Sequence, residues 1–316
     1  MRRRDFVVAG ALALSGAANA QAGPIRIIWP YAPGSAIEGL IRVLANEIGK
    51  EIGDTALVES HVGADGRIGV RDVKLAPPDG RTLLFTPYGA MVMIPLVHAD
   101  TPYDPFADFE PVSEVAALEF AIASGPMFPG RTLAELATWL KANPDKANFA
   151  APGLGSLPHF LPLRLGALIG VDMRPVPFKG SAPASLEVMA GHIPIVSNPL
   201  SELVERHRTG ELRILAVANR ERSPTAPDLP TFIEQGFDVE GVGWYGIFAP
   251  ARTPKAVIDR LNSIVVRYMR SEAGLAFAAR LGIRSSGTSP AELAAVQRAD
   301  FDRWAPVIKA SGFKGE

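Results

Sequence analysis

The stretch WPYAPGSAIEGLIRVLANEIG, from Trp29 to Gly49, joins the end of an apolar strand to a Pro-Gly-Ser turn and an amphipathic helix. Between residues 37 and 48 the apolar residues recur at helical spacing, which predicts one buried face. Ser35 can cap this helix, and Glu38, three residues later, completes a capping box. The first N–H groups of such a helix point beyond the strand and can hold an anion. The stretch therefore predicts either an ordinary strand-to-helix junction or an anion site.

The composition is that of a soluble globular protein, with 47% hydrophobic and 21% charged residues. A chain of 316 residues exceeds one typical hydrophobic core, so two domains are expected. The net charge is -1, and neither a basic excess nor a run of like charges supports a nucleic-acid partner.

Residues 1–22 are expected to be a cleaved signal peptide. Basic MRRR precedes apolar VVAGALAL and an Ala-x-Ala site that ends at Ala20, and Arg3-Arg4 is typical of a twin-arginine signal. Cleavage is expected after Ala20 or Ala22. The chain contains no Cys, so its stability after export must come from its cores and not from disulfides. A bacterial periplasm is the predicted location.

Strand and helix patterns alternate along the rest of the chain, which predicts an α/β fold with parallel-type sheets. Strands are expected at 25–29, 55–60, 81–86, 173–178, 193–199 and 212–219, extended apolar segments at 109–124 and 242–250, and helices at 36–51, 132–144, 253–270 and from 289. Ligands in such sheets bind where strands enter helices. Two Gly/Ser junctions of this kind occur at 30–38 and 152–159, about one domain length apart. One junction in each domain would place two helix N-termini across a cleft, which suits a small anion with two acidic ends.

Eight segments spread over nearly the whole chain carry a resemblance. In order they are IRIIWPYAPGSAIEGLIR, LVESHVGADGRIG, APPDGRTLLFT, TPYDPFADFEPVSEVA, NFAAPGLGSLPH, VPFKGSAPASLEVMAGHI, GWYGIFAPARTP and RWAPVIKASG. Together they resemble the periplasmic substrate-binding proteins of tripartite tricarboxylate transporters, also called the Bug family.

The resemblance implies a fold similar to type II periplasmic binding proteins, in which two α/β lobes are joined by crossing hinge strands. The implied first lobe is 23–118 plus 245–316 and the second is 119–244, with crossings near 119–124 and 242–249. It also implies a receptor, not an enzyme, that captures a small carboxylated solute between its lobes and delivers it to membrane permease subunits. No cofactor and no metal are implied, and a monomer is expected.

The family's two carboxylate loops correspond here to Tyr31 through Glu38 and Gly153 through His159. The ligand-binding residues implied by these loops are Tyr31, Gly34, Ser35, Ala36, Glu38, Gly155, Ser156 and His159. By the same resemblance the cleft is also lined by Thr86, Tyr88, Gly89, Lys179, Ser197 and Asn198.

The sequence departs from the family pattern in both loops. The first loop reads GSAIE where Gly-Gly-x-x-Asp is usual, and the second continues after Ser156 with Leu157-Pro158 where hydroxyls are usual. Ser197 stands where an Asp is common. These changes make the implied site more apolar and less acidic. They favour an acid with an apolar or aromatic body.

Several of these residues have a structural interpretation beside the functional one. Ser35 and Ser156 are caps, or caps that also contact the ligand. Glu38 is a capping partner, or it meets an amine or hydroxyl of the solute. His159 is expected to face the core, which is preferred to a direct ligand contact.

Lys179 either supplies charge to an acid or is a solvated lysine in a turn. Tyr88 and Trp244 either stack on a ligand ring or fill the hinge region. Asn198 either contacts the ligand or makes an Asx turn before Pro199.

Enzyme motifs are absent from the sequence. There is no His-Glu-x-x-His, no Gly-x-Ser-x-Gly elbow, no Walker sequence and no Cys. A secreted enzyme that processes carboxylic acids, such as an isomerase or hydrolase, and a sensory partner on the same fold remain the alternatives, since fold does not fix function.

Overall fold

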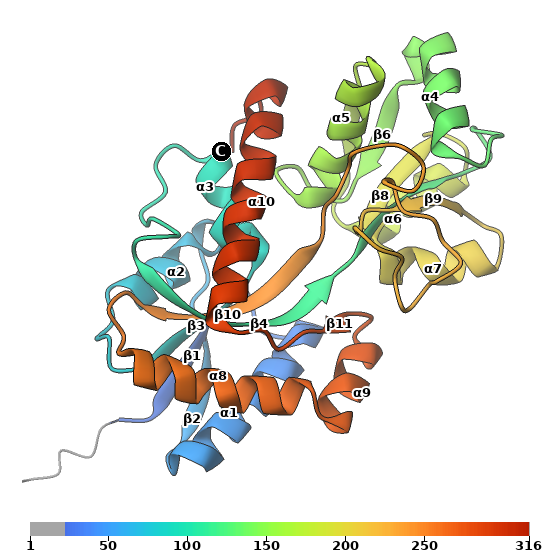
Figure 1. Ribbon diagram of the computed structural model, residues 1–316. Coiled ribbons are helices and arrows are strands. Elements are labelled where there is room, and N and C mark those ends of the chain that lie inside the picture. Colours follow the sequence, from blue (N-terminus) through green and yellow to red (C-terminus); the bar gives the residue numbers. More distant parts are fainter. Residues whose placement is uncertain (1–22, 316) are drawn as a thin grey trace, which may run out of the picture.

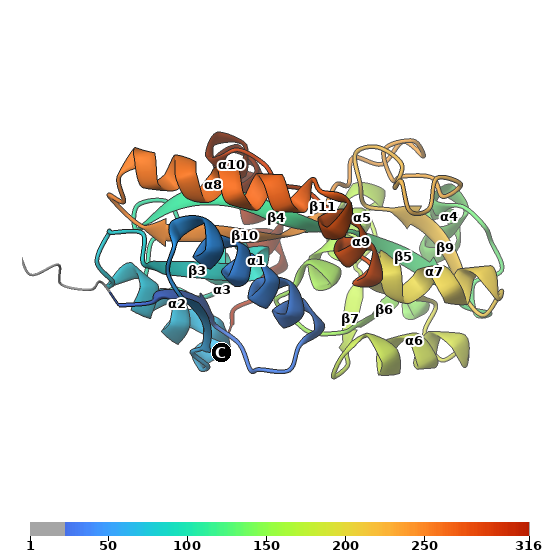
Figure 2. The same cartoon turned by 90° about the horizontal axis from the view of Figure 1, so that it is seen from below.

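The computed structural model describes residues 23–315, and the predicted signal peptide lies outside the described residues. Figures 1 and 2 show two lobes connected by long strands, each lobe built from one sheet with helices packed against it. The predicted fold class of two α/β lobes is thereby confirmed.

The first lobe contains a six-stranded sheet in the order β11-β4-β10-β3-β1-β2. β1 is parallel to β2 and β3, whereas β10 is antiparallel to β3 and β4. The strands are β1 (Ile25–Trp29), β2 (Ala56–Ser60), β3 (Thr82–Pro87), β4 (Phe109–Leu118), β10 (Gly243–Pro250) and β11 (Arg284–Ser285).

Helices from both ends of the chain cover this sheet. They are α1 (Ala36–Ile52), α2 (Arg67–Lys74), α3 (Ile94–Val97), α8 (Lys255–Met269), α9 (Glu272–Arg280) and α10 (Pro290–Ser311), with short turns η1 (Ala64–Gly66) and η2 (Gly89–Met93). α1 and α8 lie side by side in Figure 2, and their apolar faces share one buried cluster with β1. The apolar face that the sequence predicts for α1 is the face it buries, and each such fully buried aliphatic side chain contributes about 1.5–3 kcal/mol.

The second lobe contains a five-stranded sheet in the order β7-β6-β8-β5-β9. Its strands are β5 (Phe120–Ser124), β6 (Asn148–Ala151), β7 (Arg174–Pro177), β8 (Ile195–Pro199) and β9 (Arg213–Val217). Its helices are α4 (Leu133–Ala142), α5 (Leu157–Ile169), α6 (Ser181–Met189) and α7 (Leu200–Arg208), with the short turn η3 (Pro144–Lys146). β6, β7 and β8 are parallel, and β5 is antiparallel to β8 and β9.

The chain passes between the two sheets at two places. The extended segment 109–124 is divided at Glu119, because β4 belongs to the first sheet and β5 to the second. The return runs from the end of β9 to β10, which pairs with β4. The buried Glu119 carboxylate joins the two crossings by accepting hydrogen bonds from Asn219 Nδ2 (2.6 Å) and Ser223 Oγ (2.5 Å).

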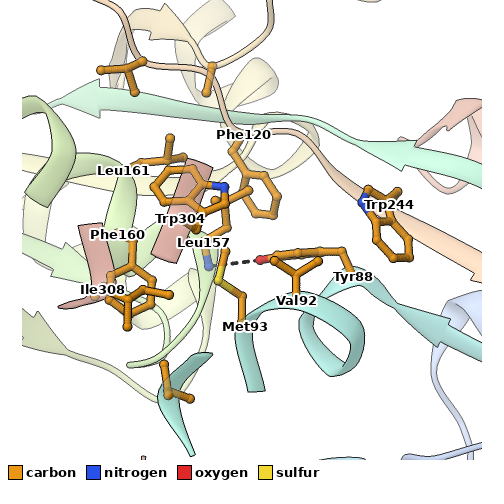
Figure 3. Close-up of a cluster of buried hydrophobic side chains, with 14 of the residues drawn as sticks. Tyr88, Val92, Met93, Phe120, Leu157, Phe160, Leu161, Trp244, Trp304 and Ile308 are labelled. Atoms are coloured by element: carbon orange, nitrogen blue, oxygen red, sulfur yellow. Dashed lines mark hydrogen bonds between the residues drawn. The ribbon is translucent and has the colours of Figure 1, made fainter. Parts of the chain in front are cut away.

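One hydrophobic cluster runs through both lobes, as Figure 3 shows. α5 contributes Leu157, Phe160 and Leu161 from the second lobe. α10 contributes Trp304 and Ile308. Side chains of η2 and β10 complete the cluster, so the lobes are packed together along α5 and α10. This contact brings the start of α5 close to the end of β3.

Candidate functional site

The first predicted loop lies between β1 and α1. Ser35 occupies the N-cap position of α1 with extended backbone angles, but its side chain makes no capping hydrogen bond. The Glu38 carboxylate instead accepts from the N–H of Gly34 at 2.7 Å and forms an ion pair with Arg42. The capping box predicted for Ser35 and Glu38 is therefore wrong, because Glu38 reaches one residue further back along the turn.

This arrangement fills an anion position with an internal carboxylate. Gly34 has φ +96°, a left-handed conformation that turns its N–H toward Glu38. The Gly34 N–H and the Arg42 guanidinium hold the pKa of Glu38 below its ordinary value, so Glu38 is charged at neutral pH. A solute carboxylate at this N–H would have to displace Glu38 and its charge.

The second predicted loop precedes α5. Ser156 is the N-cap residue, but its hydroxyl donates to Gly153 O at 2.7 Å and does not cap the helix. The N–H of Gly155 donates to His159 Nδ1 at 3.2 Å. Pro158 has no N–H, so the amide of Leu157 is the only backbone donor that the first two helical residues offer.

Tyr88 connects the two lobes at this point. It follows β3, and its hydroxyl accepts a hydrogen bond from the N–H of Leu157 at 2.9 Å, drawn as a dashed line in Figure 3. The ring packs edge-on against Phe120 and Trp244, with centroids 6.5 Å away in both cases. Tyr88 and Trp244 thus fill the hinge region, one of the two alternatives left open by the sequence.

The hydroxyl of Tyr88 remains a donor. Burial raises the pKa of Tyr88 well above its ordinary value, so the side chain stays protonated in the physiological range. Within residues 23–315 its proton has no acceptor, and the N–H of Ser156 likewise has no hydrogen-bond partner. These two donors lie on opposite lobes.

His159 lies beneath the second loop and is buried, as the sequence predicts. Its ring is near Phe149, Phe160 and Phe313, at centroid distances of 6.3, 4.6 and 5.1 Å. Burial lowers the pKa of His159 to about 4, so the ring is neutral and its Nδ1 accepts from Gly155. His159 therefore stabilises the second loop by accepting the Gly155 N–H, from a position beneath the loop.

A cavity of about 330 Å³ lies between the lobes. It is lined by Tyr31, Asp65, Tyr88, Gly89, Met93, Ile94, Val97, His98, Leu154, Gly155, Ser156, Phe313 and Gly315. Five residues predicted from sequence meet here: Tyr31, Tyr88 and Gly89 from the first lobe, and Gly155 and Ser156 from the second. Their roles as ligand contacts remain predictions.

The other predicted residues do not line this cavity. Gly34, Ser35 and Ala36 are exposed at the far end of the first loop, and Lys179 is exposed in its turn. Thr86, Ser197 and Asn198 are fully buried. Asn198 Nδ2 donates to Ser181 O (3.1 Å) and Ser185 Oγ (2.9 Å), which ties β8 to α6. Glu38 and His159 act through the loops, as described above.

A second cavity of about 620 Å³ is lined by β4, the segment between β9 and β10, and α10. Its wall includes Asp300, whose carboxylate accepts from Trp244 Nε1 at 3.0 Å and pairs with Arg303. Burial raises the pKa of Asp300 to about 6 against the opposing effect of Arg303.

Metal-binding clusters and membrane-spanning helices are both absent from the described residues. Within 23–315 no group of three or more His, Asp or Glu side chains is placed to hold a metal ion. Among the same residues, no helix has the length and apolar character required to cross a membrane.

Comparisons with known proteins agree with this geometry. The family described as "Tripartite tricarboxylate transporter family receptor" matches residues 40–313. BugT from Bordetella pertussis is 30% identical over 315 residues, which covers 98% of this chain and 95% of BugT. A solved R. palustris protein with adipate has 27% identity and a TM-score of 0.74, covering 92% of this chain and 98% of that one. A TctC solute binding protein from Polaromonas, solved with no ligand, has 24% identity and a TM-score of 0.83, covering 91% and 98%.

Two α/β lobes with a cavity between them are the architecture of the periplasmic binding proteins. The relatives of this chain by sequence and fold are solute-binding proteins. The chain belongs to the tripartite tricarboxylate transporter receptor family, and the resemblance predicted from its sequence is confirmed.

Proposed function

We propose that the protein binds a solute with a single carboxylate and an apolar or aromatic body in the 330 Å³ cavity, and presents it to a membrane permease. The observation that carries this function is the composition of the cavity, whose lining includes unpaired donors from both lobes, among them the Ser156 N–H and the Tyr88 hydroxyl. Ser156 N–H and the Tyr88 hydroxyl are both available to one carboxylate. Charged acceptors make such hydrogen bonds strong, at about 1.5–3 kcal/mol each.

Charge favours a single carboxylate. No Lys or Arg lines the cavity, and its one ordinarily charged side chain is Asp65. On the first-lobe side the Gly34 amide is already occupied by Glu38. A second solute carboxylate inside the cavity would therefore meet Asp65 without a basic partner, which costs binding free energy.

The lining and volume favour an apolar body. Met93, Ile94, Val97, Leu154 and Phe313 form much of the wall. A dry cavity of about 150 Å³ can hold benzene, so 330 Å³ has room for an aromatic ring with its carboxylate. These observations support the aromatic or apolar acid suggested by the sequence departures.

Binding and delivery follow from the two-lobe construction. A solute that touches both Tyr88 and Ser156 favours the conformation in which the lobes are together, because it makes both contacts only there. We propose that this closed form is recognised by the permease subunits. The adipate bound by the R. palustris protein supports a carboxylate ligand in this fold. The periplasmic location and the cleaved signal peptide are part of the same proposal.

An enzyme would need an acid and a base with matched pKa values in the cavity. Among the residues that line it, shifted pKa values belong to Tyr31 and Tyr88, and burial raises both. These tyrosine hydroxyls stay protonated at neutral pH, so they can donate hydrogen bonds to a solute but cannot act as an acid–base pair. The cavity therefore favours a receptor over an isomerase or hydrolase.

A thermal-shift panel tests the proposed function. Benzoate and phenylacetate are expected to raise Tm by several degrees at about 100 times Kd, because binding then adds about 2.7 kcal/mol to the free energy of unfolding. Benzamide, with the same ring and no charge, is the control and should have little effect. Stabilisation by adipate or citrate alone would contradict the single-carboxylate assignment, and turnover of a panel acid would contradict a receptor.

The Gly34 N–H lies outside the 330 Å³ cavity, so only an acid long enough to extend beyond the cavity could use it. Glu38→Ala is expected to raise the affinity for adipate about tenfold, because it frees the Gly34 N–H and removes the opposing charge for the second carboxylate of such an acid. Glu38→Gln is the matched control: it removes the charge but keeps an acceptor for Gly34, so its effect should be smaller. Calorimetric titration of both variants measures this. Weaker adipate binding to Glu38→Ala would mean that Glu38 serves the solute directly.

A further inference from the structure

The segment after α10 turns back over the cavity. Gly312 ends the helix in a left-handed conformation, with φ +66°. Phe313 then places its ring edge-on against His159 at 5.1 Å and Phe160 at 5.9 Å, both on α5. A Cβ added to Gly155 would lie 3.2 Å from the same ring. Phe313 therefore lies against the second predicted loop and the helix that follows it.

The same segment is fixed to the first lobe two residues later. The N–H of Gly315 donates to Val97 O at the end of α3, at 2.9 Å. A Cβ added to Gly315 would lie 2.4 Å from the His98 ring, so only glycine fits this approach without a shift. Figure 1 shows this end of the chain beside α3. Phe313 and Gly315, two residues apart, thus contact the second and the first lobe respectively, and both line the cavity.

We propose that Phe313–Gly315 is a specificity-determining wall of the solute site that also holds the lobes together. The role of this segment in selecting the solute rests on the proposed function. Its role in holding the lobes together rests only on the contacts described above. Phe313 is one of the apolar surfaces lining the cavity, and its ring packs against both His159 and Phe160. It selects solutes whose body presents a ring face or edge, since aromatic pairs gain beyond their buried area.

The contact with α5 has a second consequence. Phe313 follows α10, which packs on the first lobe through β4, whereas His159 and Phe160 belong to the second lobe. Any motion that separates the lobes at the cavity must break the ring contacts or detach the segment from Val97. The segment therefore favours the closed form before a solute binds, and lowers the population shift that the solute must supply.

The test compares Phe313→Ala and Phe313→Leu with the natural chain, using benzoate and acetate as probes in calorimetric titration. Phe313→Ala should weaken benzoate binding about tenfold, because the contact between the solute ring and Phe313 is lost. Acetate has no ring and loses only the support that Phe313 gives the closed form, so its binding should weaken less. Phe313→Leu keeps apolar bulk and should lose less. An equal loss for both probes, or no loss for benzoate, would overturn the specificity role.

A readout without solute tests the contact between lobes. The chain has no Cys, so labels at Lys50→Cys on α1 and Lys141→Cys on α4 report the distance between the lobes. Phe313→Ala and Gly315→Ala should each broaden or lengthen this distance relative to the natural chain. Unchanged distances in both would overturn the inference. Failure of the natural chain to bind any panel acid would instead reject the proposed function. The distances between the labels would still show whether Phe313 and Gly315 hold the lobes together.

Discussion

Tyr88→Phe is expected to weaken benzoate binding roughly ten- to hundredfold while the protein remains folded. The substitution keeps the ring against Phe120 and Trp244 but removes the hydroxyl that accepts from Leu157 N–H and can donate to a carboxylate. One hydrogen bond to a charged group is worth about 1.5–3 kcal/mol, which sets the range. Loss of the contact between the lobes adds to the effect. Calorimetric titration measures the affinity.

Tyr103→Phe provides the control for stability. Tyr103 is also buried, with its pKa raised by burial, and its hydroxyl donates to Ala90 O, but it does not line the cavity. Both variants should lose about 1–3 kcal/mol of the free energy of unfolding, because each leaves a buried polar group unpaired. Only Tyr88→Phe should lose affinity. Unchanged or tighter benzoate binding to Tyr88→Phe would mean that the solute displaces the hydroxyl and takes the Leu157 N–H itself.

Two buried groups, His159 and Asp300, should change the free energy of unfolding in opposite directions as pH falls. Burial lowers the pKa of His159 to about 4, below its unfolded value of about 6.5. As pH falls from 6.5 to 4 the unfolded chain binds a proton that folded His159 does not, so the free energy of unfolding decreases, by roughly 2–3 kcal/mol. Protonation would also remove the acceptor for Gly155 N–H and loosen the second loop.

Asp300 acts in the opposite direction. Its folded pKa is about 6, above an unfolded value of about 3.9, so the folded chain binds the proton first as pH falls. Its contribution is complete below the unfolded pKa and is lost as pH rises through 6, again by roughly 2–3 kcal/mol. Between pH 4 and 6 the two groups should largely cancel.

Two variants separate these contributions. Asp300→Asn should lose stability more steeply than the natural chain between pH 6.5 and 4.5, because the effect of His159 is then unopposed. His159→Gln, which keeps an acceptor without a charge change in this range, should lose less or gain. Urea unfolding at several pH values measures both slopes. Parallel curves for all three proteins would show that these groups titrate normally.

The sequence predicts the fold well because its signals are local. The apolar spacing of α1, the helices that begin near 132 and 289 and most strand positions are present as expected, and in the structure Thr132–Glu135 and Ser289–Glu292 form capping boxes at those two helix starts. The family resemblance placed a crossing between the lobes near 119–124, whereas the local pattern showed 109–124 only as one extended apolar segment. Nothing in the local pattern marks Glu119 as the crossing, since its partners Asn219 and Ser223 lie about one hundred residues away.

The candidate site was predicted only in part, for the same reason. Gly155 and Ser156 follow from turn chemistry, whereas the contact of Tyr88 with Leu157 depends on how two lobes pack. The Ser35–Glu38 capping box failed because Gly34 adopts a left-handed conformation that offers Glu38 a different N–H. Phe313 had no signal, because its partners on α5 are distant in sequence. Ser197 and Asn198 stand at the end of an apolar strand, where ligand-binding residues are expected. Both side chains are fully buried, so a solute cannot reach them.

A crystal structure of the protein with benzoate tests the central claim most directly. The carboxylate is expected between the lobes, within hydrogen-bond distance of Ser156 N–H and the Tyr88 hydroxyl, with the ring toward Phe313. Benzoate bound in the larger cavity beside Asp300 and Arg303, with the space between Tyr88 and Ser156 left to water, would contradict it.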